Sequence, residues 1–131
     1  MKILMLHGYA QTGDTFRRKV RRLETSLRQL DAEAEFFYLD GPVKLETHDI
    51  PGSTAAYQHR GEHDMRAWFD LRIVHNPPTG VLRSLDLLAA VLKTQGPFDG
   101  IVAFSQGTVV GAMVASLLQG EIRRRAYEAA L

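Results

Sequence analysis

The sequence contains no cysteine, and this absence excludes several kinds of chemistry at once. Without thiols the chain can hold no disulfide, no thiolate metal site and no cysteine nucleophile. An excess of one charge is also lacking, because 16 basic and 15 acidic residues leave a net charge of +1. Nucleic acid is therefore not the expected partner.

Long hydrophobic runs are lacking too. The longest, Val109 to Leu118, is about half of what a membrane-spanning helix needs. The N-terminal run Met1 to Leu6 is too short for a signal peptide and lacks a cleavage site. These two features predict a cytoplasmic protein that does not contact a membrane.

The composition is that of one ordinary globular domain. Hydrophobic residues make up 45% and charged residues 24% of the 131 residues. This length suits a single domain spanning residues 1–131, with no internal repeat.

Short apolar runs alternate with longer segments of helical period. Strands are expected at Ile3–Leu6, Phe36–Leu39 and Gly100–Phe104. Helices are expected from Asp14 or Thr15 to Leu30, from Thr79 to Thr94 and from Gln106 to Leu118. Residues 40–62 read as a long loop, and residues 63–72 as a short helix around Trp68. This alternation predicts an α/β fold of three layers, with a parallel three-stranded sheet of order 2-1-3 and flanking helices.

The most informative motif is Ala103-Phe104-Ser105-Gln106-Gly107, between the third strand and the last helix. A small–x–Ser–x–Gly turn in this place is typical of a nucleophile elbow, which exposes the serine oxygen beside a helix N-terminus. The residues two positions either side of the serine must be small, because strand and helix backbones nearly touch there. Gly107 meets this need fully, and Ala103 meets it with one additional methyl group.

A second motif, His7-Gly8-Tyr9-Ala10-Gln11-Thr12-Gly13, directly follows the first strand. In α/β-hydrolases the loop after this strand provides one N–H group of the oxyanion hole, and the residue after the nucleophile provides the other. This order assigns the backbone N–H groups of Tyr9 and Gln106 to the oxyanion hole. His7 is expected to orient the loop.

With both motifs in place, the sequence resembles the serine hydrolase (FSH) family of α/β-hydrolases. The matching segments are Leu6 to Gln11, Asp40-Gly41-Pro42, Arg66 to Phe69, and Gly96 to Gly107. The resemblance implies Ser105 as the nucleophile, with hydrolysis of a carboxylic ester or thioester. It departs from the family at Ala103, where glycine is usual. The family's catalytic aspartate and histidine lie beyond Leu131, so the chain is interpreted as truncated after the elbow helix, with its activity impaired.

The remaining candidates for a base or a metal site are weaker. His48, His59, His63 and His75 are interpreted as solvated loop residues, and Glu62 and Asp64 lack the spacing of a helical metal site. No metal and no cofactor are expected. Trp68 and Phe69 are candidates for lining an acyl pocket, although packing beneath the loop is the commoner fate of such aromatics.

Three functions remain open. The first is a hydrolase of a small ester or thioester, which includes a carrier-bound acyl chain. The second is a catalytically dead acyl-binding module, and the third is a truncated gene product without function. Self-association is expected through the strand Gly100–Phe104, which would be an exposed sheet edge.

Overall fold

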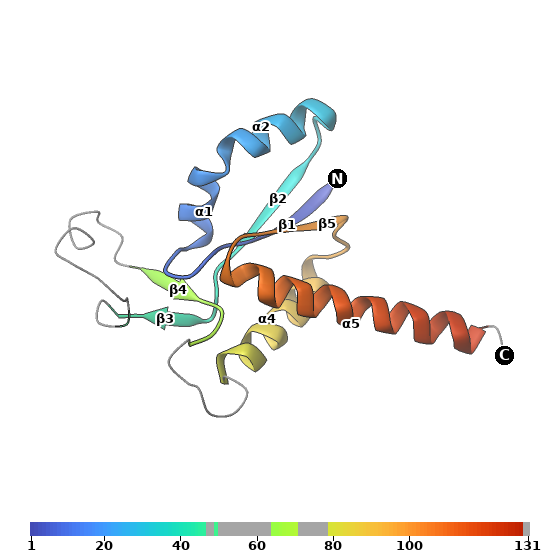
Figure 1. The fold of residues 1–131 in the computed structure, drawn as a ribbon. Coiled ribbons are helices and arrows are strands. Elements are labelled where there is room, and N and C mark those ends of the chain that lie inside the picture. The colour runs from blue at the N-terminus through green and yellow to red at the C-terminus, as the bar shows by residue number, and fades with distance from the viewer. Residues whose placement is uncertain (47–48, 50–63, 71–78, 130–131) are drawn as a thin grey trace.

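The centre of the fold is a parallel three-stranded sheet. The computed structural model describes residues 1–46, 49, 64–70 and 79–129 (Figure 1). Strands β1 (Lys2–Leu6), β2 (Glu35–Leu39) and β5 (Gly100–Ala103) pair in the order β2-β1-β5. Leu4 on β1 lies opposite Phe37 and Ile101, so all three strands end at the same edge. The expected strand order of 2-1-3 is confirmed.

Helices cover both faces of this sheet, which gives three layers (Figure 1). They are α1 (Gly13–Lys19), α2 (Arg21–Leu30), α4 (Thr79–Gln95) and α5 (Gln106–Ala129). On one face, Ile3 and Met5 pack with Phe16 of α1. On the other face, Leu4 and Leu6 pack with Trp68 and with residues of α4 and α5, including Leu88 and Val110. Strand β1 is therefore buried on both faces, as its unbroken apolar run predicts.

The single helix expected up to Leu30 is divided in two. Thr12 caps α1 by accepting a hydrogen bond from the backbone N–H of Thr15 (3.1 Å), and Val20, with φ −98° and ψ 13°, separates α1 from α2. The helical spacing of apolar residues runs across this break, but Leu23 and Leu30 at its far end are exposed. Spacing alone did not reveal the break, because Leu27 beyond it packs against the same core cluster as Val20, so the apolar stripe runs through the break.

The long loop and the short helix expected between residues 40 and 72 are both wrong in part. Strand β3 (Val43–Leu45) pairs antiparallel with β4 (Met65–Ala67), with Lys44 opposite Arg66. The backbone N–H of Arg66 also donates to the carbonyl of Gln11 (3.0 Å). Three-residue strands are too short to show a period of two, and their pairing joins segments distant in sequence.

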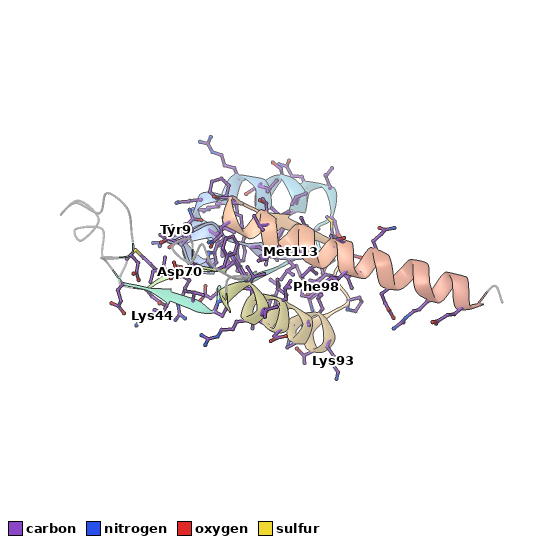
Figure 2. All side chains as sticks on the ribbon, turned by 60° about the horizontal axis from the view of Figure 1, so that its bottom comes forward. Tyr9, Lys44, Asp70, Lys93, Phe98 and Met113 are labelled. Carbon is purple, nitrogen blue, oxygen red and sulfur yellow. The ribbon has the colours of Figure 1, made fainter. Side chains whose placement is uncertain are left out.

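One side of the molecule is apolar and open. Within the described residues, β5 pairs with β1 along one edge and with no strand along the other. A hollow of about 630 Å³ lies there, lined by residues that include Phe98, Ile101 and Leu118. Helix α5 also exposes Val109, Met113, Leu117 and Leu118 (Figure 2, where Met113 is labelled). None of the helices in the described part of the chain is long and apolar enough to span a membrane.

We expect this open side to drive self-association of the 131-residue chain, because exposed apolar patches mark interfaces or aggregation sites. Sedimentation velocity should show dimers or larger species that Leu117→Lys reduces. Leu30→Lys on α2 is the matched control, since Leu30 is also exposed but lies on the other helical layer. A monodisperse wild-type monomer with a sharp melting transition above roughly 60 °C would contradict the prediction.

Candidate active site

Ser105 lies in the sharp turn between β5 and α5. Its φ of 51° places it in the left-handed region, which a residue with a side chain rarely adopts. The turn is closed by two backbone hydrogen bonds, from Gly107 N–H to the Phe104 carbonyl (3.0 Å) and from Thr108 N–H to the Ser105 carbonyl (2.9 Å). The side chain is exposed. The strained conformation expected of an elbow serine is therefore present.

The residues on either side of the serine show why small side chains are needed. A Cβ atom on Gly107 would lie 2.5 Å from the carbonyl oxygen of His7 and 2.6 Å from that of Leu6, distances that backbone atoms do not permit. The methyl group of Ala103 faces α5 at Gly111. A Cβ atom added to Gly111 would lie 3.6 Å from the Cβ of Ala103, which is an ordinary contact distance. Helix α5 thus accommodates the one additional methyl group of the motif.

The loop between β1 and α1 lies against the elbow. A Cβ atom on Gly8 would lie 3.3 Å from the Cβ of Ser105 and 2.9 Å from the Phe104 ring. The backbone N–H of Gly8 donates to the side chain of Gln11 (3.1 Å), and the hydroxyl of Tyr9 donates to the carbonyl of Asp49 (2.9 Å). The structure therefore brings Ser105 and the loop that carries Tyr9 together. The oxyanion role of Tyr9 and Gln106 stays a prediction.

His7 is fully buried, and both of its ring nitrogens are bound to backbone groups. Nε2 accepts a hydrogen bond from the backbone N–H of Gly41 (2.9 Å), so the proton is on Nδ1, which donates to the carbonyl of Gly8 (2.7 Å). Burial lowers the pKa of His7 below its ordinary value. A neutral histidine with no unoccupied nitrogen is suited to orient the loop and not to accept a proton from Ser105.

The other groups considered as a base or metal ligand contribute little within the described residues. Asp64 forms an ion pair with Arg66 (2.7 Å between Oδ1 and Nε). The interpretation of His48, His59, His63, His75 and Glu62 concerns positions outside the described residues.

Trp68 and Phe69 lie in a bend directly after β4, joined to the start of α5 by hydrogen bonds. The backbone N–H of Trp68 donates to Oε1 of Gln106 (2.8 Å), its carbonyl accepts from the hydroxyl of Ser84, and its indole N–H donates to the carbonyl of His7 (2.7 Å). The backbone N–H and carbonyl of Trp68 bond to side chains on α5 and α4. They are therefore not available for the hydrogen bonds of the short helix that the sequence predicted around Trp68. The indole is fully buried in the core, and Phe69 is half-buried. The predicted pocket role of these two side chains stays a prediction.

Sequence reasoning missed the side chain of Gln106 as a part of the site. Its Nε2 donates to the carbonyl of Phe69 (2.7 Å), so one amide group holds both Trp68 and Phe69. Gly41 was noticed only as part of a turn, yet a Cβ there would overlap the carbonyl of Ala67. No local pattern signals these contacts, because their partners lie 26 to 38 residues away in the sequence.

A serine at φ 51° between strand β5 and helix α5, with the loop after β1 packed against it, has the geometry typical of a nucleophile elbow in α/β-hydrolases. The family model described as "Serine hydrolase (FSH1)" matches residues 1–129, and the chain belongs to this serine hydrolase family.

Several curated relatives are similar over nearly the whole chain. "Esterase OVCA2" of Bos taurus is 35% identical over 92% of this chain and 56% of the relative. "Family of serine hydrolases 2" of Saccharomyces cerevisiae is 32% identical over 90% of this chain and 54% of the relative. A "Dihydrofolate reductase" of Schizosaccharomyces pombe is 30% identical over 91% of this chain but only 26% of its own length, so most of that protein lies outside the match. The chain spans about half the length of the Bos taurus and Saccharomyces cerevisiae relatives and 26% to 28% of the two Schizosaccharomyces pombe relatives it matches.

We expect Gly107→Ala to destabilise the fold by about 3 kcal/mol, because overpacking against fixed backbone distorts strand or helix. Urea unfolding followed by circular dichroism measures this. Gly120→Ala is the matched control on the same helix, because an added Cβ there meets nothing within 4 Å. That variant should gain about 1 kcal/mol through helix propensity. Equal effects of the two substitutions would contradict the tight contact.

His7 should make stability depend on pH in a defined window. Because its pKa is lowered in the folded state, the unfolded chain binds a proton first as the pH falls below about 6.5. Stability is therefore fully present above this pH and falls below it, by at most ~1.4 kcal/mol per pH unit. Urea midpoints at pH 7.5 and 5.5 should differ more for the wild type than for His7→Asn. An equal pH dependence in both proteins would show that His7 does not contribute.

Proposed function

We propose that this site hydrolyses carboxylic esters through an acyl-serine intermediate on Ser105. The observation that carries the proposal is the exposed serine at φ 51°, with the Gly8 loop packed against its Cβ. The family to which the chain belongs, and the esterase names of several relatives, support the same chemistry.

The proposed reaction has two steps. Ser105 Oγ attacks the ester carbonyl carbon while a base removes its proton, and the carbonyl oxygen becomes an oxyanion held by the backbone N–H groups of Tyr9 and Gln106. Collapse of this intermediate breaks the carbon–oxygen bond, and the alcohol leaves with the proton. Water then attacks the acyl-serine by the same route and releases the acid. A thioester, free or on a carrier, is the second substrate class, because a thiolate is also a good leaving group.

The base in this proposal is a group other than His7. Both ring nitrogens of His7 hold backbone groups, and moving either one would disturb the loop that carries Tyr9. A serine without a base is a poor nucleophile at neutral pH. Without such a base, turnover of an ester would be roughly 10⁴-fold or more below that of a complete triad, so the rate of ester hydrolysis by the 131-residue chain tests whether it holds one.

Covalent trapping tests the nucleophile independently of turnover. The purified chain is incubated with a fluorophosphonate probe, and the modified residue is identified by mass spectrometry. We expect modification at Ser105, loss of modification in Ser105→Ala, and no change in Ser26→Ala, where an exposed helical serine is removed.

The same proteins are assayed with a short-chain p-nitrophenyl ester. Weak hydrolysis that disappears in Ser105→Ala supports the proposal. Modification at another residue would overturn it. Tight binding of an acyl ligand without modification of Ser105 would instead favour the acyl-binding module, and robust turnover would show that the chain holds a base.

A further inference from the structure

The side-chain amide of Gln106 joins the elbow to a segment far from it in sequence. Gln106 directly follows Ser105, begins α5 and is only 6% exposed. Its Oε1 accepts from the backbone N–H of Trp68 (2.8 Å), and its Nε2 donates to the carbonyl of Phe69 (2.7 Å). The oxygen and the nitrogen of the Gln106 amide both bond to the backbone of residues 68–69. Because the amide group is rigid, these two bonds fix both the position and the direction of that segment.

Trp68 continues this connection toward the opposite side of the site. Its indole N–H donates to the carbonyl of His7 (2.7 Å), and its rings lie 5.1 Å from the imidazole ring of His7. The hydroxyl of Ser84 on α4 binds its carbonyl, so the indole has little freedom to shift. The position of the His7 backbone therefore depends on where Gln106 holds Trp68.

His7 in turn fixes the peptide group that carries the proposed oxyanion donor. Its Nδ1–H donates to the carbonyl of Gly8, and this carbonyl belongs to the same planar peptide as the N–H of Tyr9. The Gly8–Tyr9 peptide is trans, so its C=O and N–H point in opposite directions. Holding the oxygen against the buried imidazole therefore directs the Tyr9 N–H away from the core.

We propose that the Gln106 side chain is a positioning residue that sets the oxyanion loop relative to Ser105 through Trp68 and His7. The inference rests on the proposed function, because it assigns a role within the same site. One residue then contributes twice: its backbone N–H is a proposed oxyanion donor, and its side chain aligns the second donor.

Gln106→Glu gives a sharp test, because the pattern of hydrogen bonds depends on the protonation of the new carboxyl group. The neutral acid can accept from Trp68 N–H and donate to the Phe69 carbonyl, as the amide does. The ionised carboxylate can only accept, so it faces the Phe69 carbonyl without a proton. Gln106→Met keeps the length but loses both hydrogen bonds at every pH.

The first measurement is the rate of Ser105 modification by the fluorophosphonate probe between pH 5 and 8, divided by the wild-type rate at each pH. Division removes the titration of His7, whose pKa Asp40 and Arg66 influence electrostatically in both proteins. We expect Gln106→Glu to be slower by roughly 10- to 100-fold at pH 8 and to recover as the pH falls, since misaligned oxyanion donors weaken transition-state stabilisation. Gln106→Met should be slow throughout, and Gln119→Glu, exposed on the same helix, should match the wild type.

The second measurement is amide hydrogen exchange in the peptide that contains residues 7–11. We expect faster exchange there in Gln106→Met under conditions where circular dichroism shows a folded protein. Faster exchange only around residues 68–69, or a modification rate in Gln106→Glu that stays at a constant ratio across pH, would overturn the inference. If the wild-type Ser105 is not modified, the proposed function fails, and exchange at residues 7–11 alone decides whether Gln106 positions the loop.

Discussion

The contact between the start of α5 and the end of β1 is the constraint on which the site depends. Gly107 places the helix backbone where any side chain would meet the carbonyl oxygens of Leu6 and His7. This close approach fixes the elbow directly above the central strand. It also places Ser105 beside Gly8, since Gly8 directly follows Leu6 and His7 in the sequence. Ser105, the proposed nucleophile, and the loop after β1 are therefore positioned by one backbone contact, and both lie at the carboxyl ends of parallel strands.

Trp68 explains how polar groups are buried next to that contact without a large penalty. A buried polar group without a partner is destabilising, so such groups are nearly always hydrogen-bonded. The backbone N–H, the carbonyl and the indole N–H of Trp68 each have a partner, from α5, α4 and the loop after β1 respectively. Its rings meanwhile pack among Leu4, Leu6 and Leu88 in the main core. Trp68 therefore belongs both to the apolar core and to the hydrogen-bonded groups that surround the site.

The sequence allowed the local parts of this arrangement to be predicted. The apolar runs predicted the strands and their order, and the spacing of Ala103, Ser105 and Gly107 predicted the elbow, because these signals lie within a few residues. The pairing of β3 with β4 could not be predicted, since each strand is three residues long. The same holds for the Gln106–Trp68 and Trp68–His7 hydrogen bonds, whose partners lie 38 and 61 residues apart. The break at Val20 is a change in backbone dihedral angles, and the period of the apolar residues does not encode it because Leu27 beyond the break packs on the same core.

The electrostatics of the site follow from a neutral histidine and a helix N-terminus. Helix α5 begins at Gln106, so the first N–H groups of a 24-residue helix lack partners within the helix and give this end a partial positive charge. Burial lowers the pKa of His7 and so favours its neutral form, which leaves the N-terminal end of the α5 dipole as the positive partial charge that these elements place beside Ser105. Fixed amide dipoles need no reorganisation when an oxyanion forms, and they do not titrate. The part of the site built on β1 and α5 is therefore suited to stabilise negative charge, and in the proposed hydrolysis the proton transfer is assigned to a group other than His7.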